Sequence, residues 1–161
     1  AAQGGDPAFV HFPRGLEHAK NRTTGNGLAI EMCLSFSGLK TSLLYHLKNH
    51  PDDRERHPAD LAASYQEAVM DSLATRAERA LSATGARTLA CVGGVAKNAV
   101  LRGKLETLAR RHAAALLLTP LAYCTDNAAM VAAAAGLRVR AGLDNPPAVE
   151  ADPSLPLVEE E

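Results

Sequence analysis

The sequence predicts an α/β fold, because short apolar runs alternate with amphipathic segments in the second half of the chain. Residues 88–92 form an apolar run typical of a buried strand, and residues 115–118 form a second one. Helical patterns over residues 96–112 and 126–140 follow these two runs. Strand, helix, strand and helix with short connections predict a right-handed crossover and a parallel pair of strands.

The first half predicts helices preceded by irregular structure. Residues 1–34 are rich in Gly, Pro and Asn, which is typical of a surface stretch. Leucines recur at helical spacing from Ser37, a candidate N-cap, until Pro51 ends the pattern. A polar linker over 51–57 precedes a longer helical pattern that begins near Pro58 and ends at Gly85. Two strands are too few for a free-standing parallel sheet, so we expect this domain to need further strands.

Charge divides the chain into a body and a tail. The 161 residues carry a formal net charge of −1, but residues 1–143 carry +5 and residues 144–161 carry −6. The proline-rich, acidic tail has too few bulky side chains to offset its ordering entropy. We therefore predict one domain over 1–143 and a disordered tail over 144–161.

Composition excludes several classes of protein. The longest nearly uninterrupted apolar stretch covers residues 128–137, which is shorter than the roughly 18 residues that cross a bilayer. The chain has three cysteines and no Cys-x-x-Cys pair, so neither a disulfide framework nor a cysteine zinc site is indicated. We expect a cytoplasmic protein with no membrane partner.

The first candidate site is the turn that follows the first strand, where Gly93 and Gly94 precede a helical pattern that contains Asn98. Glycines let a backbone approach a ligand closely, and a helix N-terminus favours anions. The Asn98 side chain can both donate and accept hydrogen bonds. Spacing alone also fits a tight strand-to-helix turn with a solvated asparagine, since a Gly-Gly pair is weaker than a phosphate-loop signature.

The second candidate is Asp126, which follows the second strand and stands at the start of the last helical pattern. Ligands of open α/β sheets bind at the carboxyl ends of strands, so this carboxylate is a candidate metal ligand or orienting group. It is also the negative charge that helix N-termini favour for stability alone.

Other polar residues have a structural interpretation. His46 and His50 have the spacing of a zinc pair, but the sequence offers no third ligand nearby, so we interpret them as helix-boundary residues. We expect the basic residues of the helix after Asn98 to form a solvated face, although phosphate contact remains an alternative. These residues are Arg102, Lys104, Arg110 and Arg111. We expect Cys124 to serve in packing.

Several segments together resemble one known family. They are residues 35–41 (SFSGLKT), 59–68 (ADLAASYQEA), 93–98 (GGVAKN) and 124–130 (CTDNAAM). In this order and spacing they resemble the C-terminal half of the tRNA N6-adenosine threonylcarbamoyltransferase family, also known as the glycoprotease family. The resemblance covers about residues 4–142.

The resemblance implies a fold and a reaction. It implies the C-terminal lobe of an actin-like ATPase fold with ribonuclease-H-like lobes, without the N-terminal lobe. It implies transfer of a threonylcarbamoyl group from threonylcarbamoyl-AMP to the N6 amine of the anticodon-adjacent adenosine in tRNAs that read codons beginning with A. It also implies partner subunits. Because the family's metal histidines have no counterpart here, we expect this fragment to be inactive alone.

The resemblance also assigns site residues. Asp126 matches a metal-ligating aspartate, with Fe²⁺ as the expected metal, one per subunit of the complete enzyme, and zinc as an alternative. Asn98 matches an asparagine that contacts the adenylate, and Gly93 and Gly94 match the turn that lines its pocket. No residue is assigned with certainty as a catalytic group.

Two other functions are alternatives. A carbamoyltransferase of the hydrogenase-maturation type shares the superfold and a Gly-Gly-Val turn, but the segment around Asp126 argues against it. A non-catalytic scaffold paralogue of the same modification pathway would not be expected to retain both Asn98 and Asp126.

Overall fold

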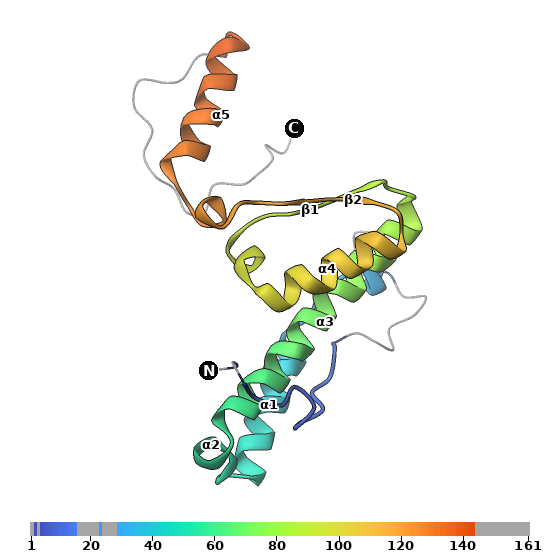
Figure 1. Ribbon diagram of the computed structural model, residues 1–161, viewed down its shortest axis with the longest axis vertical. Coiled ribbons are helices and arrows are strands. Elements are labelled where there is room, and N and C mark those ends of the chain that lie inside the picture. Colours follow the sequence, from blue (N-terminus) through green and yellow to red (C-terminus); the bar gives the residue numbers. More distant parts are fainter. Residues whose placement is uncertain (1, 3, 16–22, 24–28, 144–161) are drawn as a thin grey trace. The chain divides into compact units, whose positions relative to one another are not determined.

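The computed structural model describes residues 2, 4–15, 23 and 29–143 (Figure 1). Its helices are α1 (Ser37–Asn49), α2 (Asp53–Arg56), α3 (Pro58–Thr84), α4 (Ala99–Arg111) and α5 (Ala128–Arg140). Its strands are β1 (Thr88–Cys91) and β2 (Ala115–Leu118), and short 3-10 turns cover Ile30–Met32, Gly94–Lys97 and Leu121–Tyr123. The tail expected over 144–161 lies outside the described residues.

The chain divides into two compact units, Ala1–Thr125 and Asp126–Glu161. The first unit contains α1 to α4 and both strands, and the described part of the second consists mainly of α5. All contacts below lie within one unit.

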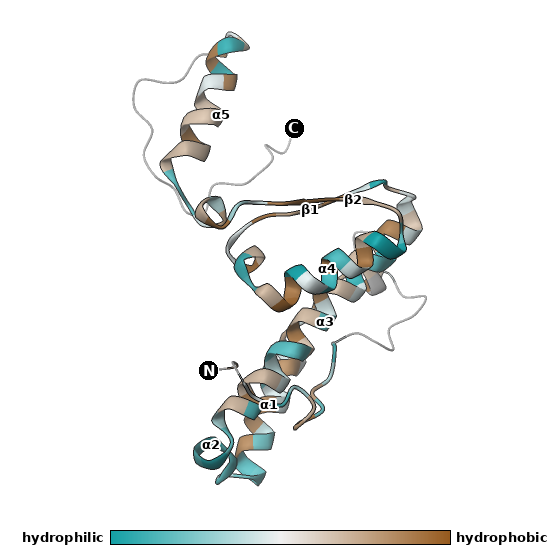
Figure 2. Ribbon diagram, viewed as in Figure 1, coloured by the Kyte–Doolittle hydropathy of each residue, from teal (hydrophilic) through white to brown (hydrophobic). Residues whose placement is uncertain are grey.

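A parallel strand pair confirms the predicted α/β class. Within the described residues β1 pairs with β2 alone, and Thr88 to Cys91 stand opposite Ala115 to Leu118 in register. Both strands are strongly apolar (Figure 2). Exposure nevertheless alternates along them: Leu89 and Leu116 pack against the helices, whereas Ala90 and Leu117 are exposed. One face of the pair is therefore covered within the first unit, and the other face is open.

The first unit is built around α3. The part of α3 from Met70 onward and the inner face of α4 bury an apolar cluster under the strands, consisting of Met70, Leu81, Leu101, Leu105 and Leu108. The N-terminal half of α3 buries a second cluster of Phe12, Leu39, Leu61 and Ala68 against α1 and the N-terminal segment. Each large apolar side chain buried in this way stabilises the fold by about 1.5–3 kcal/mol. Gly85 ends α3 with a φ of 64°, as its position after the helical pattern predicted.

Several helix boundaries differ from the sequence prediction. The linker predicted over 51–57 contains the short helix α2, whose Asp53 Oδ2 pairs with His46 Nε2 of α1 at 2.9 Å. The N-cap of α1 is Phe36, so Ser37 is the first helical residue. At α4 and α5 the N-caps are Asn98 and Asn127, because a side-chain amide oxygen of each accepts backbone hydrogen bonds from the first turn.

Among the residues that the structure describes, no helix is long and apolar enough to cross a membrane.

Candidate functional site

The glycine loop, residues 92–98, leaves β1 and leads into α4. Gly93 has φ 85° and ψ 176°, a backbone conformation that is open essentially to glycine alone. A side chain at Gly94 would meet the Thr125 methyl group, since a Cβ built there lies 3.9 Å from Thr125 Cγ2. Both glycines are exposed, so their backbone can be approached from solvent.

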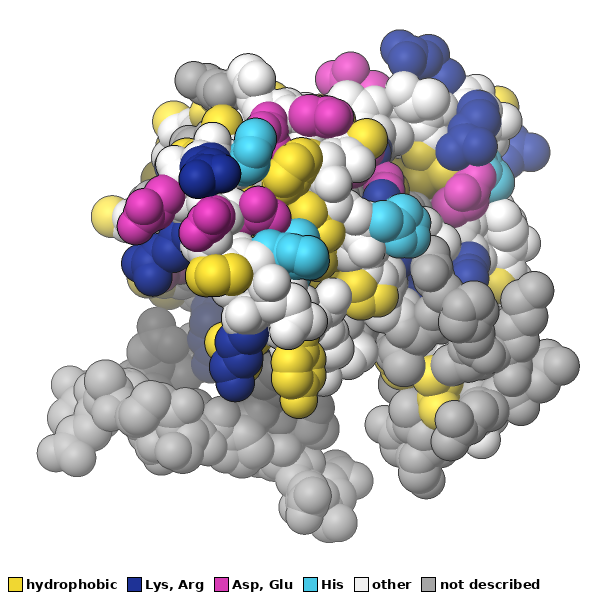
Figure 3. Space-filling model, turned by 90° about the horizontal axis from the view of Figure 1, so that it is seen from below, with side chains coloured by type: hydrophobic (Ala, Val, Ile, Leu, Met, Phe, Trp, Pro, Cys, Tyr) yellow, Lys and Arg dark blue, Asp and Glu magenta, His cyan; other side chains and the backbone are white. Residues whose placement is uncertain are grey.

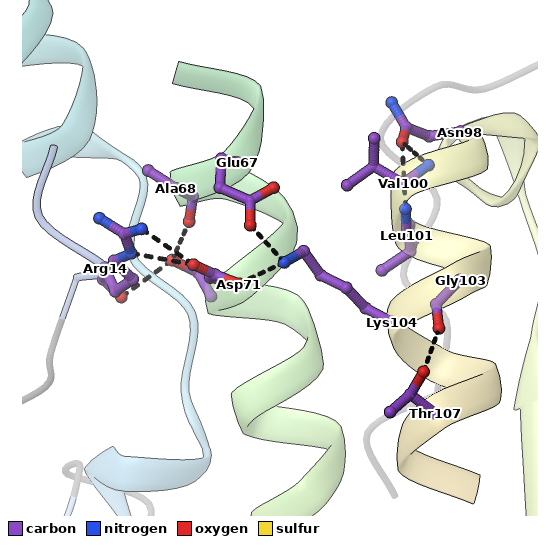
Figure 4. Close-up of polar contacts among 11 residues, drawn as sticks. Arg14, Glu67, Ala68, Asp71, Asn98, Val100, Leu101, Gly103, Lys104 and Thr107 are labelled. Atoms are coloured by element: carbon purple, nitrogen blue, oxygen red, sulfur yellow. Dashed lines mark hydrogen bonds and ion pairs between the residues drawn. The ribbon is translucent and has the colours of Figure 1, made fainter. Parts of the chain in front are cut away.

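Asn98 stands at the end of this loop as the N-cap of α4. Its Oδ1 accepts hydrogen bonds from the backbone N–H groups of Val100 (3.0 Å) and Leu101 (3.1 Å) (Figure 4). Its Nδ2 donates to Gln66 Oε1 on α3 at 2.9 Å. The carboxamide nitrogen carries a second hydrogen, and this N–H can donate a hydrogen bond to a ligand. Asn98 is therefore fixed in orientation by three bonds, and the contact with Gln66 is one that the sequence did not predict.

The β2 loop, residues 119–125, lies beside the glycine loop. The backbone N–H of Thr119 donates to the Cys91 carbonyl at 3.2 Å, which extends the strand pairing by one residue. Cys124 is 2% exposed and its thiol lies 3.5 Å from the carbonyls of Thr119 and Pro120. The expectation that Cys124 serves in packing is confirmed. The first unit thus places Gly93, Gly94 and Asn98 together at the carboxyl ends of the two strands.

Asp126 begins the second unit. It is exposed and precedes Asn127, whose Oδ1 accepts a hydrogen bond from the Met130 backbone N–H at 3.0 Å. The cap of α5 is therefore Asn127, and Asp126 is outside the helix. Asp126 therefore does not cap α5, and its charge lies one residue before the cap, where a helix N-terminus still favours it.

The expected solvated face of α4 is wrong for two of its four basic residues. Arg102 and Lys104 are partly buried and hydrogen-bonded, whereas Arg110 and Arg111 are exposed. Lys104 Nζ lies 2.6 Å from Glu67 Oε1 and 2.7 Å from Asp71 Oδ1 on α3. The sequence places these charges on separate helices, so only their packing reveals that they pair.

Asp71 also binds Arg14 of the N-terminal segment, so one carboxylate joins three parts of the unit (Figure 4). Its Oδ2 accepts from Arg14 Nη2 at 2.9 Å and from Nε at 3.1 Å. Burial raises the pKa of Asp71, but hydrogen bonds from Lys104 and Arg14 outweigh this and lower it overall. For Lys104 burial lowers the pKa, and hydrogen bonds to Asp71 and Glu67 raise it overall.

The Asp71 contacts predict a pH-dependent stability. Because the folded-state pKa of Asp71 lies below its unfolded value of 3.8, its contribution is present above that value and is lost as the pH falls through the folded-state pKa. We expect Asp71→Asn to lower the free energy of unfolding by about 1–2 kcal/mol at pH 7 and by less at pH 3, measured by urea denaturation.

Asp52→Asn is the matched control, because Asp52 and its partner Arg56 are 3.7 Å apart and largely exposed. It should leave the free energy of unfolding unchanged. Wild-type stability of Asp71→Asn at pH 7 would show that the pairing contributes nothing.

His46 and His50 lie at the C-terminal end of α1, as the sequence predicted. Their ring centroids are 4.7 Å apart with the planes tilted by 41°, and His46 Nε2 pairs with Asp53 Oδ2. No group of three or more His, Cys, Asp or Glu side chains able to hold a metal occurs among the described residues. Figure 3 shows that acidic, basic and histidine side chains intermingle on the face seen from below.

Comparisons with known proteins identify the family. The sequence model of the tRNA N6-adenosine threonylcarbamoyltransferase family matches residues 3–133. This chain belongs to that family. Curated relatives named tRNA N6-adenosine threonylcarbamoyltransferase include those of Salinibacter ruber, 42% identical, and Chloroherpeton thalassium, 40% identical. The matches cover 97% and 93% of this chain, but only 45% and 42% of those proteins.

A third relative of the same name, from Thermotoga neapolitana, is 40% identical over 96% of this chain and 43% of its own length. The chain thus spans a little under half the length of these relatives. Family membership, which the sequence motifs predicted, is confirmed. The match includes Gly93, Gly94, Asn98 and Asp126, while the roles of these four residues stay predictions.

Proposed function

We propose that this chain forms part of an acyltransferase that moves a threonylcarbamoyl group from threonylcarbamoyl-AMP to the N6 amine of the anticodon-adjacent adenosine, in tRNAs that read codons beginning with A. Family membership supports the reaction class. The structural observation that carries the proposal is Asn98, which three hydrogen bonds hold beside the exposed Gly93–Gly94 turn. Capping of α4 uses only the amide oxygen of Asn98, which leaves the second N–H of Nδ2 for a ligand.

We also propose that the fold is the C-terminal lobe of an actin-like ATPase fold with ribonuclease-H-like lobes. The parallel β1–β2 pair, with α4 as the crossover, is consistent with this arrangement. In such sheets ligands bind at the carboxyl ends of the strands, where the glycine loop and the β2 loop both begin.

The residues of this chain would act mainly by binding. Gly93 and Gly94 let the adenylate approach the backbone, and Asn98 Nδ2 donates to it. The N6 amine then attacks the carbonyl carbon of the carbamoyl group. A C–N bond forms, the bond from that carbon to the phosphate oxygen breaks, AMP leaves, and the amine loses one proton. We assign no described residue as the base that takes this proton.

Asp126 would supply one carboxylate to a metal ion, with Fe²⁺ as the proposed metal and zinc as the alternative. Its exposure suits a ligand, but the described residues alone do not complete a metal site. Further ligands would have to come from outside them. Such an ion would bind and polarise the acyl donor.

Three further proposals complete the function. The enzyme acts in the cytoplasm, and partner subunits assist the transfer. Residues 1–161 alone are inactive, because one carboxylate does not hold a divalent ion against water.

The test compares the complete protein, supplied with its partner subunits, with residues 1–161 alone. Each is incubated with threonylcarbamoyl-AMP and unmodified tRNA, and the modified nucleoside is measured by mass spectrometry after nuclease digestion. We expect product from the complete protein and none from residues 1–161. Absence of product together with carbamoyl transfer from carbamoyl phosphate would favour the carbamoyltransferase alternative. Failure to bind a stable adenylate analogue would favour the scaffold alternative.

A further inference from the structure

Arg102 joins the two loops that border the candidate site. It projects from α4, and its Nε donates to the Ala96 carbonyl in the glycine loop. Its Nη2 donates to the Thr119 carbonyl in the β2 loop and lies 3.6 Å from Cys124 Sγ. Ala96 lies six residues before Arg102 in the sequence, and Thr119 lies 17 residues after it. One guanidinium therefore bonds to both loops.

The sites of attachment are well packed. Ala96 is 1% exposed and Thr119 is half-buried, so water has limited access to the two accepting residues. A buried carbonyl without a hydrogen-bond partner costs about 1–3 kcal/mol. Both carbonyls accept from Arg102, a single position on α4. A planar guanidinium with several N–H donors can reach both at once, whereas an ammonium group is a point charge on a flexible stem.

The residues that Arg102 contacts lie close to the groups proposed to bind substrate. Ala96 falls between Gly94 and Asn98 in the sequence, and its own N–H donates to the Gly93 carbonyl at 3.0 Å. In the β2 loop, Cys124 directly precedes Thr125, whose methyl group faces Gly94. Because the Cys124 thiol lies 3.5 Å from the Thr119 carbonyl, both accepting carbonyls are connected to residues close to the glycine turn.

We propose that Arg102 is a positioning residue for adenylate binding, which acts by holding the glycine loop and the β2 loop in one fixed arrangement. The proposal rests on the proposed function for the identity of the ligand. The loop-holding step itself depends only on the contacts of the first unit. Arg102 does not need to touch the substrate, because Asn98 and the glycine backbone present the binding groups.

The test uses the complete protein and the substitutions Arg102→Met and Arg102→Lys. Hydrogen exchange should become about tenfold faster at the backbone amides of 93–98 and 119–125 in Arg102→Met, with unchanged exchange in the α3 core. Titration with a stable threonylcarbamoyl-adenylate analogue should show binding weakened about ten- to hundredfold. Arg102→Lys can bond one carbonyl at a time, so it should slow exchange only partly toward the wild-type rate and restore little of the affinity.

Arg110→Met is the matched control on the same helix. Arg110 is exposed and bonds only the hydroxyl of Thr107 among the contacts described for it, so both readouts should stay at wild-type values. Wild-type exchange and affinity in Arg102→Met would overturn the proposal, as would full affinity in Arg102→Lys. If the wild-type protein fails to bind the analogue while the two loops still loosen in Arg102→Met, the proposed function fails and the loop-holding role stands.

Discussion

Asn98→Ala should weaken binding of a stable threonylcarbamoyl-adenylate analogue by about tenfold or more and lower the free energy of unfolding by about 1 kcal/mol. The affinity falls because the Nδ2 donor is lost. The stability falls because the N–H groups of Val100 and Leu101 lose their acceptor and Gln66 loses its donor. Isothermal titration calorimetry on the complete protein and urea denaturation measure the two effects.

Asn98→Asp separates the two roles of this side chain. A carboxylate is as good an N-cap as a carboxamide, so the stability should return to the wild-type value. It has no N–H to give to a ligand, and its charge opposes an adenylate phosphate, so the affinity should stay low. Gln66→Ala removes only the bond that orients Nδ2 and should give an intermediate affinity. Wild-type affinity in Asn98→Asp would show that Asn98 is a cap and nothing more.

Local patterns were sufficient to predict the main elements of the fold. Helical periodicity from Pro58 to a glycine located α3, and apolar runs located both strands to within one residue. The boundaries of α4 and α5 were less well predicted, since an asparagine is equally acceptable before a helix and within its first turn until its hydrogen bonds are known. The helix α2 was missed because four polar residues carry no apolar periodicity.

The candidate site could be predicted only in part from the sequence. Adjacent glycines before a helix are a local signal, so the Gly93–Gly94 turn and Asn98 were found. The contact of Gln66 with Asn98 and that of Arg102 with Thr119 were not found, because they join residues 32 and 17 positions apart in the sequence, which no motif encodes. The pairing of Lys104 with Glu67 and Asp71 was missed for the same reason: charge on a helix predicts solvation unless the facing helix is known.

Asp126→Asn should remove the metal from the complete protein and lower the rate of threonylcarbamoyl transfer by more than about a hundredfold, since losing even an outer-shell partner of a metal ligand costs roughly 10- to 100-fold. Because Asp126 is exposed and outside α5, the free energy of unfolding should change by no more than about 0.5 kcal/mol. Metal content by mass spectrometry, transfer activity and urea denaturation test these expectations together.

The neighbouring residue provides the matched control. Asn127→Ala removes the acceptor for the Met130 N–H, so it should destabilise the start of α5 by about 1 kcal/mol, visible as faster hydrogen exchange there. Its metal content should stay at the wild-type value. Asp126→Asn is thus expected to lower the metal content without changing the stability, and Asn127→Ala to lower the stability without changing the metal content. Normal metal content in Asp126→Asn would contradict the assignment of Asp126 as a ligand, and metal loss in both variants would show that the start of α5, rather than the Asp126 carboxylate, governs binding.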